Sequence, residues 1–258
     1  MGTVTKALSL LTYFNHSRPE IGLSDLTRLS GMNKATVYRM MREMQEQGFV
    51  EQAGGERAYR LGPEVLRLAA LREAAVPLLS VAREVLDALC ADTGETAHMS
   101  LVRGGALNTL AYRYSPAHAT RVMMEDAEVL SFHATSSGLA VLGFADPDFT
   151  DAILSRPLKA HTDSTVTDAD AIRSALAEVR ASGIAESVGG FEAEVHSHAA
   201  PVFGADRRPI GALAVAAPVA RVTDATRPAI RDRVARHAAD LTRRIGGFPP
   251  DGFPGVGA

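Results

Sequence analysis

The first 61 residues pass from helical spacing of apolar residues to an alternating pattern. Apolar residues recur at helical spacing over Thr3–Phe14, which predicts a supporting helix, and Pro19 and Gly22 mark the loop after it. Ser24 is expected to cap a second helix through its hydroxyl group, and Gly31 permits the sharp turn that ends that helix. This order of elements predicts a helix-turn-helix.

A third helix is predicted to begin near Asn33 and to end at Gly48. Four apolar residues at positions i, i+3, i+4 and i+7 share one face, which must be buried: Val37, Met40, Met41 and Met44. The helix start and the opposite face carry small, polar and cationic residues that suit the major groove of DNA: Asn33, Lys34, Ala35, Thr36, Tyr38, Arg39 and Arg42. Together with Ser24, these are the candidate DNA-binding residues of a recognition helix.

A hairpin is predicted after this helix. Phe49–Gln52 and Arg57–Leu61 flank the turn residues Gly54 and Gly55, so residues 1–61 are read as a winged helix-turn-helix. Arg57 is either a contact to a phosphate or the minor groove, or a charge that keeps the hairpin soluble. The pattern does not choose between these two roles.

A helical linker is predicted over residues 62–91. Gly62 and Pro63 open a helix that runs to about Ala75, and Pro77 restarts a further helix that runs to about Ala91.

From Glu95 the apolar period changes from 3.6 to 2, and alternation over residues 96–101 predicts a half-buried strand. Further strands are predicted over Ala106–Tyr114, Arg121–Met124, Ile184–Ser187, Val195–Phe203 and Ile210–Ala216. Helices are predicted over Thr135–Phe144, Asp148–Leu154, Ala169–Ser182 behind the cap Asp168, and Ala225–Ile245. Residues 92–246 thus form a second domain of the α+β class with a mostly antiparallel sheet. The Gly- and Pro-rich tail, residues 247–258, is expected to be disordered.

Composition and charge limit the class of protein. The chain has 258 residues, of which 46% are hydrophobic, and it lacks an unbroken apolar run of membrane-spanning length and an export signal, so a soluble cytoplasmic protein is expected. The single Cys90 is predicted to be a buried apolar residue. Residues 1–61 hold eight Lys and Arg against six Asp and Glu, a charge of +2, whereas the remainder carries −5. One copy should therefore bind DNA weakly, which favours a homodimer or homotetramer.

Several segments, taken in order, resemble the IclR family of bacterial transcription regulators. They are GMNKATVYRM, QEQGFVEQ, YRLGPEVLRLA, FHATSSGLAVLGF and GIAESVGGFEAEVHSHAAPVFGADRRPIGALAVAAP. The resemblance covers nearly the whole chain and implies an N-terminal DNA-binding domain, a helical linker that helps dimerisation, and a GAF-like C-terminal domain that binds a small effector. Family members usually act as dimers or tetramers.

The family's recognition segment typically reads LPKSTVHRLL. Lys34, Thr36 and Arg39 match this pattern, whereas Tyr38 replaces a frequent His and Ala35 a frequent Ser. The double-stranded DNA operator is therefore expected to differ at the bases that these two side chains approach. The alternative is that the helix cations are only solvated surface charges.

The resemblance also implies an effector pocket between the sheet and the helix that begins with Thr135, Ser136, Ser137 and Gly138. Amides at a helix N-terminus can bind a carboxylate, although Thr135 and Ser136 would also serve as ordinary caps. Three further positions depart from the family pattern, because Ser197 stands for a frequent Cys, and Ala214 and Ala216 stand for two hydroxyl residues. With His98, these complete the candidate effector-binding residues, and the lost hydroxyls predict an apolar pocket.

Two histidines offer a different hypothesis. His196 and His198 lie at i and i+2 of a strand and share a face, where they could bind a metal with neighbours drawn from a wider set: His98, His133, His161, Glu192 and Glu194. If Ser197 points into the pocket, both imidazoles point away from it. Roles in ligand or interface hydrogen bonding, or as ordinary polar residues, stay open.

Three function classes follow. The first is a ligand-responsive DNA-binding regulator, by resemblance a repressor released by an aromatic or hydrophobic carboxylic acid or its derivative, with an activator as the alternative. The second is a metal-sensing regulator. The third, an enzyme, is disfavoured because the chain shows no nucleophile elbow, phosphate loop or HExxH motif. No catalytic residue, cofactor or membrane partner is expected.

Overall fold

The computed structural model describes most of the chain, namely residues 2–14, 18–53, 58–75, 77–124 and 129–254. It contains two compact units, Met1–Pro77 and Leu78–Ala258. The division falls inside the predicted linker of residues 62–91, because its first helix belongs to the first unit and its second helix to the second.

The first unit is a winged helix-turn-helix. Its elements are α1 (Thr3–Leu11), β1 (Glu20–Gly22), α2 (Leu23–Ser30), α3 (Lys34–Glu46), β2 (Val50–Gln52), β3 (Ala58–Leu61) and α4 (Pro63–Ala75). The strands form an antiparallel sheet in the order β1-β3-β2. The predicted apolar face of α3 is buried against Leu10 of α1 and Leu26 of α2.

Two local predictions for this unit were wrong. Ser24 does not cap α2, because the helix already begins at Leu23 and no side chain caps it at Gly22. The segment before α2 was predicted as loop, but Glu20–Gly22 forms strand β1, with Glu20 opposite Arg60. A strand of three residues is too short to show an alternating pattern, and it forms because β3 offers a free edge. By contrast, Gly31 ends α2 with a φ of 64°, as predicted.

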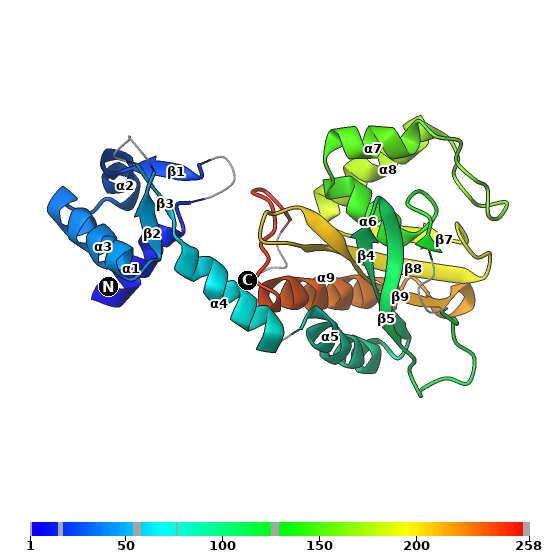
Figure 1. Ribbon diagram of the computed structural model, residues 1–258. Helices are drawn as coiled ribbons and strands as arrows, with labels where there is room; N and C mark the ends of the chain where they lie inside the picture. The colour runs from blue at the N-terminus through cyan, green and yellow to red at the C-terminus, as the bar shows by residue number, and fades with distance from the viewer. Residues whose placement is uncertain (1, 15–17, 54–57, 76, 125–128, 255–258) are drawn as a thin grey trace. The chain divides into compact units, whose positions relative to one another are not determined.

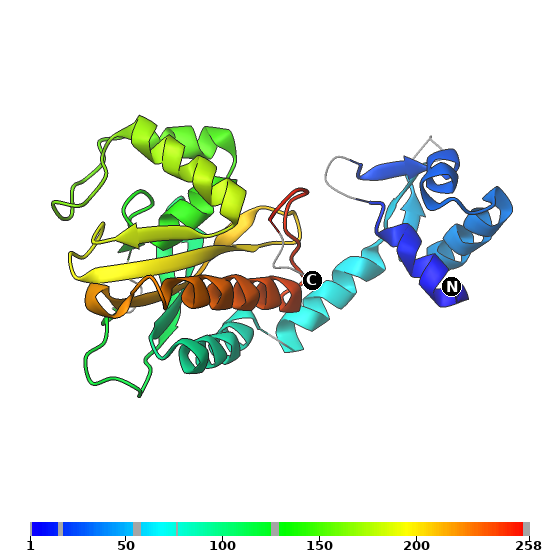
Figure 2. The same cartoon turned by 180° about the vertical axis from the view of Figure 1, so that it is seen from behind.

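The second unit is an antiparallel sheet between helices. Its elements are α5 (Leu78–Thr93), β4 (Thr96–Arg103), β5 (Ala106–Arg113), β6 (Val129–Leu130), α6 (Ser136–Phe144), α7 (Pro147–Leu154), α8 (Ala169–Ser182), β7 (Ala185–Val188), β8 (Val195–Phe203), β9 (Pro209–Pro218), a 3-10 turn (Val219–Arg221) and α9 (Arg227–Arg244). The strand order is β6-β5-β4-β9-β8-β7. Helices α5 and α9 cover one face, and α6, α7 and α8 lie on the other (Figures 1 and 2).

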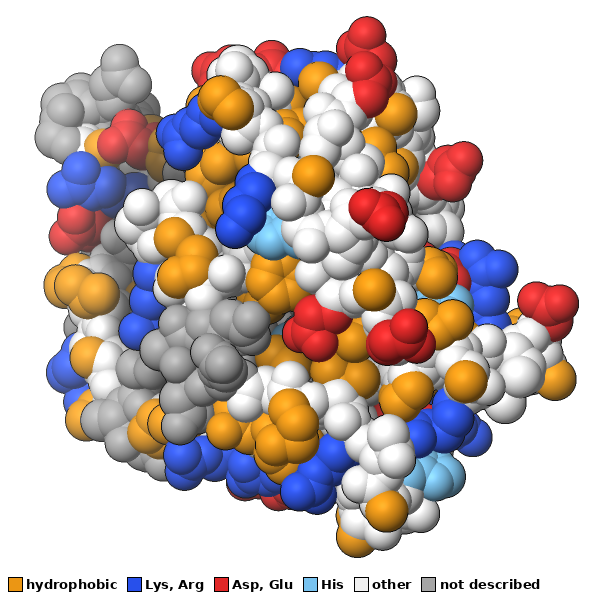
Figure 3. Space-filling view, turned by 90° about the vertical axis from the view of Figure 1, so that its right-hand side faces the viewer, with side chains coloured by type: hydrophobic (Ala, Val, Ile, Leu, Met, Phe, Trp, Pro, Cys, Tyr) orange, Lys and Arg blue, Asp and Glu red, His pale blue; other side chains and the backbone are white. Residues whose placement is uncertain are grey.

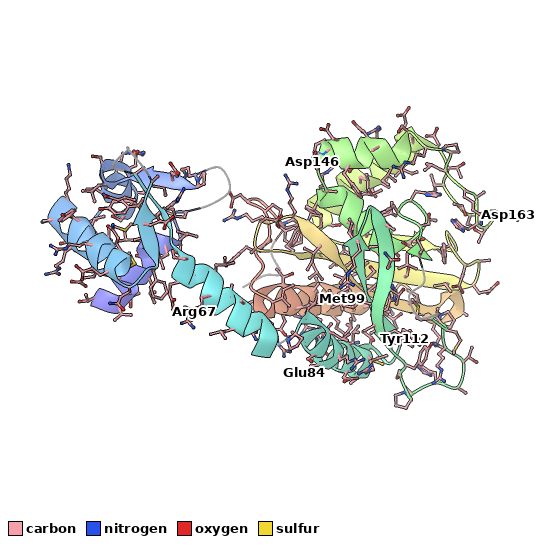
Figure 4. The ribbon with its side chains drawn as sticks, viewed as in Figure 1. Arg67, Glu84, Met99, Tyr112, Asp146 and Asp163 are labelled. Carbon is pink, nitrogen blue, oxygen red and sulfur yellow. The ribbon has the colours of Figure 1, made fainter. Side chains whose placement is uncertain are left out.

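Each face of the sheet has its own apolar core. Met99, labelled in Figure 4, is fully buried together with Leu213 and Val215 on the face that α5 and α9 cover. Ala212 and Ala214 pack on the opposite face against α6 and α8. The alternation along β9 is thus between two cores, not between a core and solvent. For the same reason β4, predicted to be half-buried, is buried on both faces over its first six residues.

One predicted strand is absent among the described residues. Arg121–Met124 is irregular, and the neighbour of β5 is instead β6, whose Leu130 pairs with Leu107. The Tyr114 hydroxyl group accepts a hydrogen bond from the Met124 N–H at 2.9 Å, so a side chain holds this segment in place of a strand partner.

The described part of the tail, residues 247–254, is ordered, contrary to prediction. Phe253 packs its ring against Phe144 and Phe203 at centroid distances of 5.0 and 5.1 Å. The Gly247 N–H donates to the Thr242 carbonyl at 2.8 Å. One aromatic ring in a shallow apolar site is enough to order a segment whose composition alone suggests disorder.

The prediction for the single cysteine is confirmed. Cys90 is 4% exposed in the core under α5, and burial raises the pKa of its thiol. Within the described ranges, none of the helices combines the length and the apolar character that crossing a membrane would need.

On the face displayed in Figure 3, acidic and basic side chains are interspersed with hydrophobic ones.

Candidate functional site

The start of α3 is held by a side-chain cap. The Asn33 side-chain oxygen accepts hydrogen bonds from the N–H groups of Ala35 and Thr36, at 2.8 and 3.3 Å. Asn33 therefore fixes where the helix begins, which is a structural role for a residue predicted to contact DNA.

The face of α3 opposite the core is open to solvent. Among the predicted residues of the helix and its cap, Thr36 is half-buried, and the exposed ones are Asn33, Lys34, Ala35, Tyr38, Arg39 and Arg42. The guanidinium of Arg42 contacts Glu46 one turn later at 3.2 Å. This exposed face can enter a major groove while the methionine face stays in the core.

A surface hollow lies between α3 and the three-stranded sheet. Ser24, Lys34 and Tyr38 line it together with Gln52 of β2. Gln52 was not predicted, since β2 is too short for its pattern to show which side chain faces the recognition helix. Arg57 lies outside the described residues.

The second unit holds a cavity between the sheet and the start of α6. Its lining combines hydroxyl groups, apolar side chains, one imidazole and one carboxylate: His98, Val122, Met124, Leu130, Thr135, Ser136, Ser137, Ser187, Phe191, Glu192, Val195, Ser197 and Ala216. Six of the eight predicted effector-binding residues are among them. The free volume is about 40 Å³, room for roughly three water molecules.

Gly138 and Ala214 do not line the cavity. A Cβ atom on Gly138 would lie 2.3 Å from the Phe132 backbone, so this glycine allows α6 to approach the preceding chain. Ala214 has no exposed surface and packs in the core between the sheet and α6. Both residues therefore position the site and are not part of its surface.

Thr135 caps α6 and lines the cavity at once. Its hydroxyl group accepts a hydrogen bond from the Gly138 N–H at 3.0 Å and donates to the Ser131 carbonyl at 2.8 Å. Ser136 and Ser137 follow in the first helical turn, where N–H groups lack partners within the helix. Both residues line the cavity, and first-turn amides together with the positive end of a helix dipole favour an anion nearby.

His98 is the buried titratable group of this cavity. Its Nε2 lies 3.2 Å from the Ser137 Oγ, and its Nδ1 has no hydrogen-bond partner among the described residues. Burial lowers the pKa of His98 from 6.5 to about 4, so the imidazole is neutral at pH 7. A neutral ring with a free nitrogen can form one further hydrogen bond to a ligand.

The stability of the second unit should fall as the pH falls from about 6.5 to 4. Over this interval the unfolded chain binds more protons than the folded chain, because folding lowers the pKa of His98. The loss attributable to this imidazole between pH 6.5 and pH 5 is on the order of 2 kcal/mol. Urea denaturation at several pH values should show a shallower pH dependence for His98→Gln. An unchanged pH dependence in that variant would contradict the assignment.

Sequence reasoning missed two polar cavity residues. Ser187 donates a hydrogen bond to the Ala134 carbonyl at 2.8 Å, and Glu192 is the only carboxylate of the described lining, which contains no Lys or Arg. Ser187 lies in the four-residue strand β7 and Glu192 in the turn between β7 and β8, and neither segment is long enough for a periodic pattern to mark the direction of a side chain.

His196 and His198 lie on the opposite face of β8 from Ser197, as the alternation predicts. Their rings stack at a centroid distance of 4.6 Å, and both contact Glu186 of β7, a neighbour that sequence reasoning missed. Burial lowers the pKa of His198 to about 4. Burial raises the pKa of Glu186, but hydrogen bonds from Arg227 and His196 outweigh it, and this pKa lies below its ordinary value.

The other residues proposed for a metal site do not join this group. His133 is hydrogen-bonded to the Ser131 hydroxyl group and the Lys159 carbonyl, each at 3.0 Å, and its ring lies 6.1 Å from that of His161. Within the described ranges, the grouped metal-ligating side chains are Glu186, His196 and His198.

Comparison with known proteins covers both units. Residues 72–243 match the family described as bacterial transcriptional regulator IclR C-terminal, and residues 3–54 match the IclR helix-turn-helix domain. The transcriptional repressor IclR of Escherichia coli is 25% identical over 253 residues, which cover 95% of this chain and 90% of that protein.

Two solved structures have the same architecture. An IclR transcriptional regulator of Silicibacter sp. TM1040 is 63% identical, with a TM-score of 0.85 over 99% of this chain and 100% of that one. An IclR homologue of Microbacterium hydrocarbonoxydans, solved in complex with 4-hydroxybenzoate, is 25% identical, with a TM-score of 0.59 over 95% of this chain and 98% of that one.

The family matches, the winged helix-turn-helix and the effector-domain fold agree with one another. These relatives are DNA-binding regulators and not enzymes. The chain belongs to the IclR family of bacterial transcriptional regulators.

Proposed function

We propose that this protein is a repressor that a small aromatic or otherwise hydrophobic carboxylic acid, or a derivative of one, releases from a double-stranded DNA operator. The observation that carries the proposal is the cavity at the start of α6, whose apolar and hydroxyl-bearing lining adjoins the N-terminus of that helix.

The chemistry of the lining supports a ligand with one acidic end and an apolar body. The first-turn amides of Ser136 and Ser137 can bind a carboxylate, while Val122, Leu130 and Phe191 present apolar surface to the rest of the ligand. The absence of Lys and Arg from the described lining, together with the carboxylate of Glu192, disfavours a dianion.

The free volume is smaller than an aromatic acid, so ligand entry requires lining side chains to move. Met124 is half-buried and belongs to a segment without regular hydrogen-bonded structure, held through the Tyr114 hydroxyl group. Moving this segment should cost less free energy than moving the helix or the sheet. The complex of the Microbacterium homologue with 4-hydroxybenzoate shows that an aromatic acid binds a regulator of this fold.

Two parts of the chain would link effector binding to operator binding. The exposed face of α3 is proposed to read the major groove, and the helices α4 and α5 are proposed to set the spacing of two copies. A homodimer or homotetramer is proposed because residues 1–61 carry a net charge of only +2, which supplies few phosphate contacts per copy. An effector then acts by binding one arrangement more tightly than the other.

Calorimetric titration with benzoate, 4-hydroxybenzoate, pyruvate and glyoxylate tests the ligand class. Benzoate-type acids should bind and the two small keto acids should not, because Ala216, which stands where the family has a hydroxyl residue, lines the cavity and cannot hydrogen-bond to a keto oxygen. An acid that binds should also release the protein from a fragment selected from random-sequence DNA. Tight pyruvate binding without benzoate binding would refute the proposed ligand class.

Ser137→Ala keeps the backbone amide but removes the hydroxyl group that lines the cavity beside His98, and it should weaken the binding of whichever acid binds by about fivefold, since one hydrogen bond is worth about 1 kcal/mol. Ser174→Ala is the matched control, because the Ser174 hydroxyl group bonds to the Asp170 carbonyl on exposed α8. Equal affinities of both variants would show that the Ser137 hydroxyl group does not contact the ligand.

A further inference from the structure

A second buried polar cluster lies on the sheet face opposite the effector cavity. Glu186 of β7 meets His196 and His198 of β8, and one ligand atom from each of the three lies within 4.8 Å of the others. The Glu186 Oε1 is 2.5 Å from the His196 Nε2 and 3.2 Å from the His198 Nε2. Three donor atoms thus converge on one point.

Strand register brings these residues together. Glu186 lies directly opposite His198 in the antiparallel pair of β7 and β8, and His196 is two residues away on the same face. Ser187 and Ser197, the alternate residues, face the effector cavity. The convergence is therefore built into the backbone pairing and does not depend on a flexible side chain.

The ring nitrogens of His198 lack hydrogen-bond partners among the described residues. The residue is fully buried, and neither ring nitrogen has a hydrogen-bond partner among the described residues, since its approach to Glu186 lacks hydrogen-bond geometry. Buried polar atoms in folded proteins almost always have a partner. A metal ion bound at Nε2 would give one of these two nitrogens a partner.

Arginines hold the other oxygen of the carboxylate. Arg227 and Arg231 of α9 contact the Glu186 Oε2 at 2.5 and 3.3 Å, which leaves Oε1 directed at the two rings. Ligating carboxylates in metal sites are commonly fixed in this way by hydrogen bonds from outside the ligand set. The Arg227 side chain is 47% exposed, so water screens much of its repulsion toward a cation.

We propose that Glu186, His196 and His198 bind one divalent transition-metal ion, with Zn²⁺ as the best match to two imidazoles and one carboxylate. The ligand atoms are Oε1 of Glu186 and Nε2 of each histidine. On binding, the ion replaces the hydrogen bond between the His196 Nε2 and the Glu186 Oε1, and both histidines carry their proton on Nδ1. A fourth position is left for water. The ion ties the edge strand β7 to β8 and, through the arginines, to α9, and Glu186 adjoins Ser187 of the effector cavity.

The test uses the full-length protein, produced without a His-tag and dialysed against a chelator. Titration with Zn²⁺ should show one site per chain and raise the melting temperature. Titration with Co²⁺ should give the visible absorption of a four-coordinate ion with nitrogen and oxygen ligands. Less than half an equivalent of bound metal would overturn the proposal.

Variants decide which residues bind the ion. Glu186→Gln and His198→Gln should each weaken Zn²⁺ binding at least tenfold and remove the cobalt absorption. His237→Gln is the matched control, because His237 also contacts a carboxylate, that of Asp92 at 2.7 Å, but lies on α9 outside the cluster. Circular dichroism confirms that each variant is folded. Unchanged affinity in folded Glu186→Gln, or equal loss in the control, would refute the site.

Discussion

Gly138→Ala should destabilise the second unit by about 3 kcal/mol, the largest effect that we expect from adding one methyl group to the effector-site helix. The new Cβ would lie 2.3 Å from both Cα and the carbonyl oxygen of Phe132. Backbone atoms cannot rotate aside as a side chain does, so α6 must move away from the chain that precedes it. Urea denaturation measures the loss, and hydrogen exchange of the α6 amides localises it.

Gly143→Ala, in the same helix, separates this clash from helix propensity. Replacing Gly by Ala inside a helix should stabilise it by about 1 kcal/mol at either position. At Gly143 the nearest atom to the added Cβ is the side-chain Cγ1 of Val179 at 2.8 Å, which can shift. The control should therefore be nearly neutral, and similar stabilities of the two variants would contradict the proposed close approach of α6 to Phe132.

The parts of the fold that were predictable are those in which one pattern repeats over several turns. The methionine face of α3 recurs over two helical turns and is buried as predicted. Helix α8 begins after the cap Asp168 and ends at Ser182 as predicted, and Gly183 follows in the left-handed conformation. Strands β1 and β6 have three and two residues, too few for any period, and their existence depends on a free edge of a neighbouring strand.

The strand face on which each candidate-site residue lies was predictable, but which residues of that face reach the cavity surface was not. Alternation correctly separated Ser197 from His196 and His198, because side chains of a strand alternate regardless of their surroundings. It could not separate Ala216, which lines the cavity, from Ala214, which is packed under α6 two residues earlier on the same face. Glu186 was missed because its proximity to the histidines arises from the pairing register of β7 with β8, which the apolar pattern does not show.

Arg39→Ala should weaken operator binding by about tenfold to a hundredfold, which corresponds to the 1–3 kcal/mol that one arginine contact to a base edge contributes. Arg39 is exposed on the face of α3 opposite Met40 and Met41, so its removal leaves the core of the unit unchanged. Gel shift or fluorescence anisotropy with a fragment selected from random-sequence DNA measures the loss. Effector binding should be unaffected, because Arg39 belongs to the first unit and the cavity to the second.

Arg67→Ala removes the same charge from the same unit without touching the recognition face. Arg67, labelled in Figure 4, lies on α4 and pairs with Glu64 at 2.5 Å. Attraction to phosphates depends on charge and is screened by salt. If Arg39 acted only through its charge, the two variants should therefore lose equal affinity for DNA. A role in base recognition requires a much larger loss for Arg39→Ala and a relaxed choice of sequence at one base pair. Equal losses with unchanged sequence preference would show that the α3 cation only attracts the backbone.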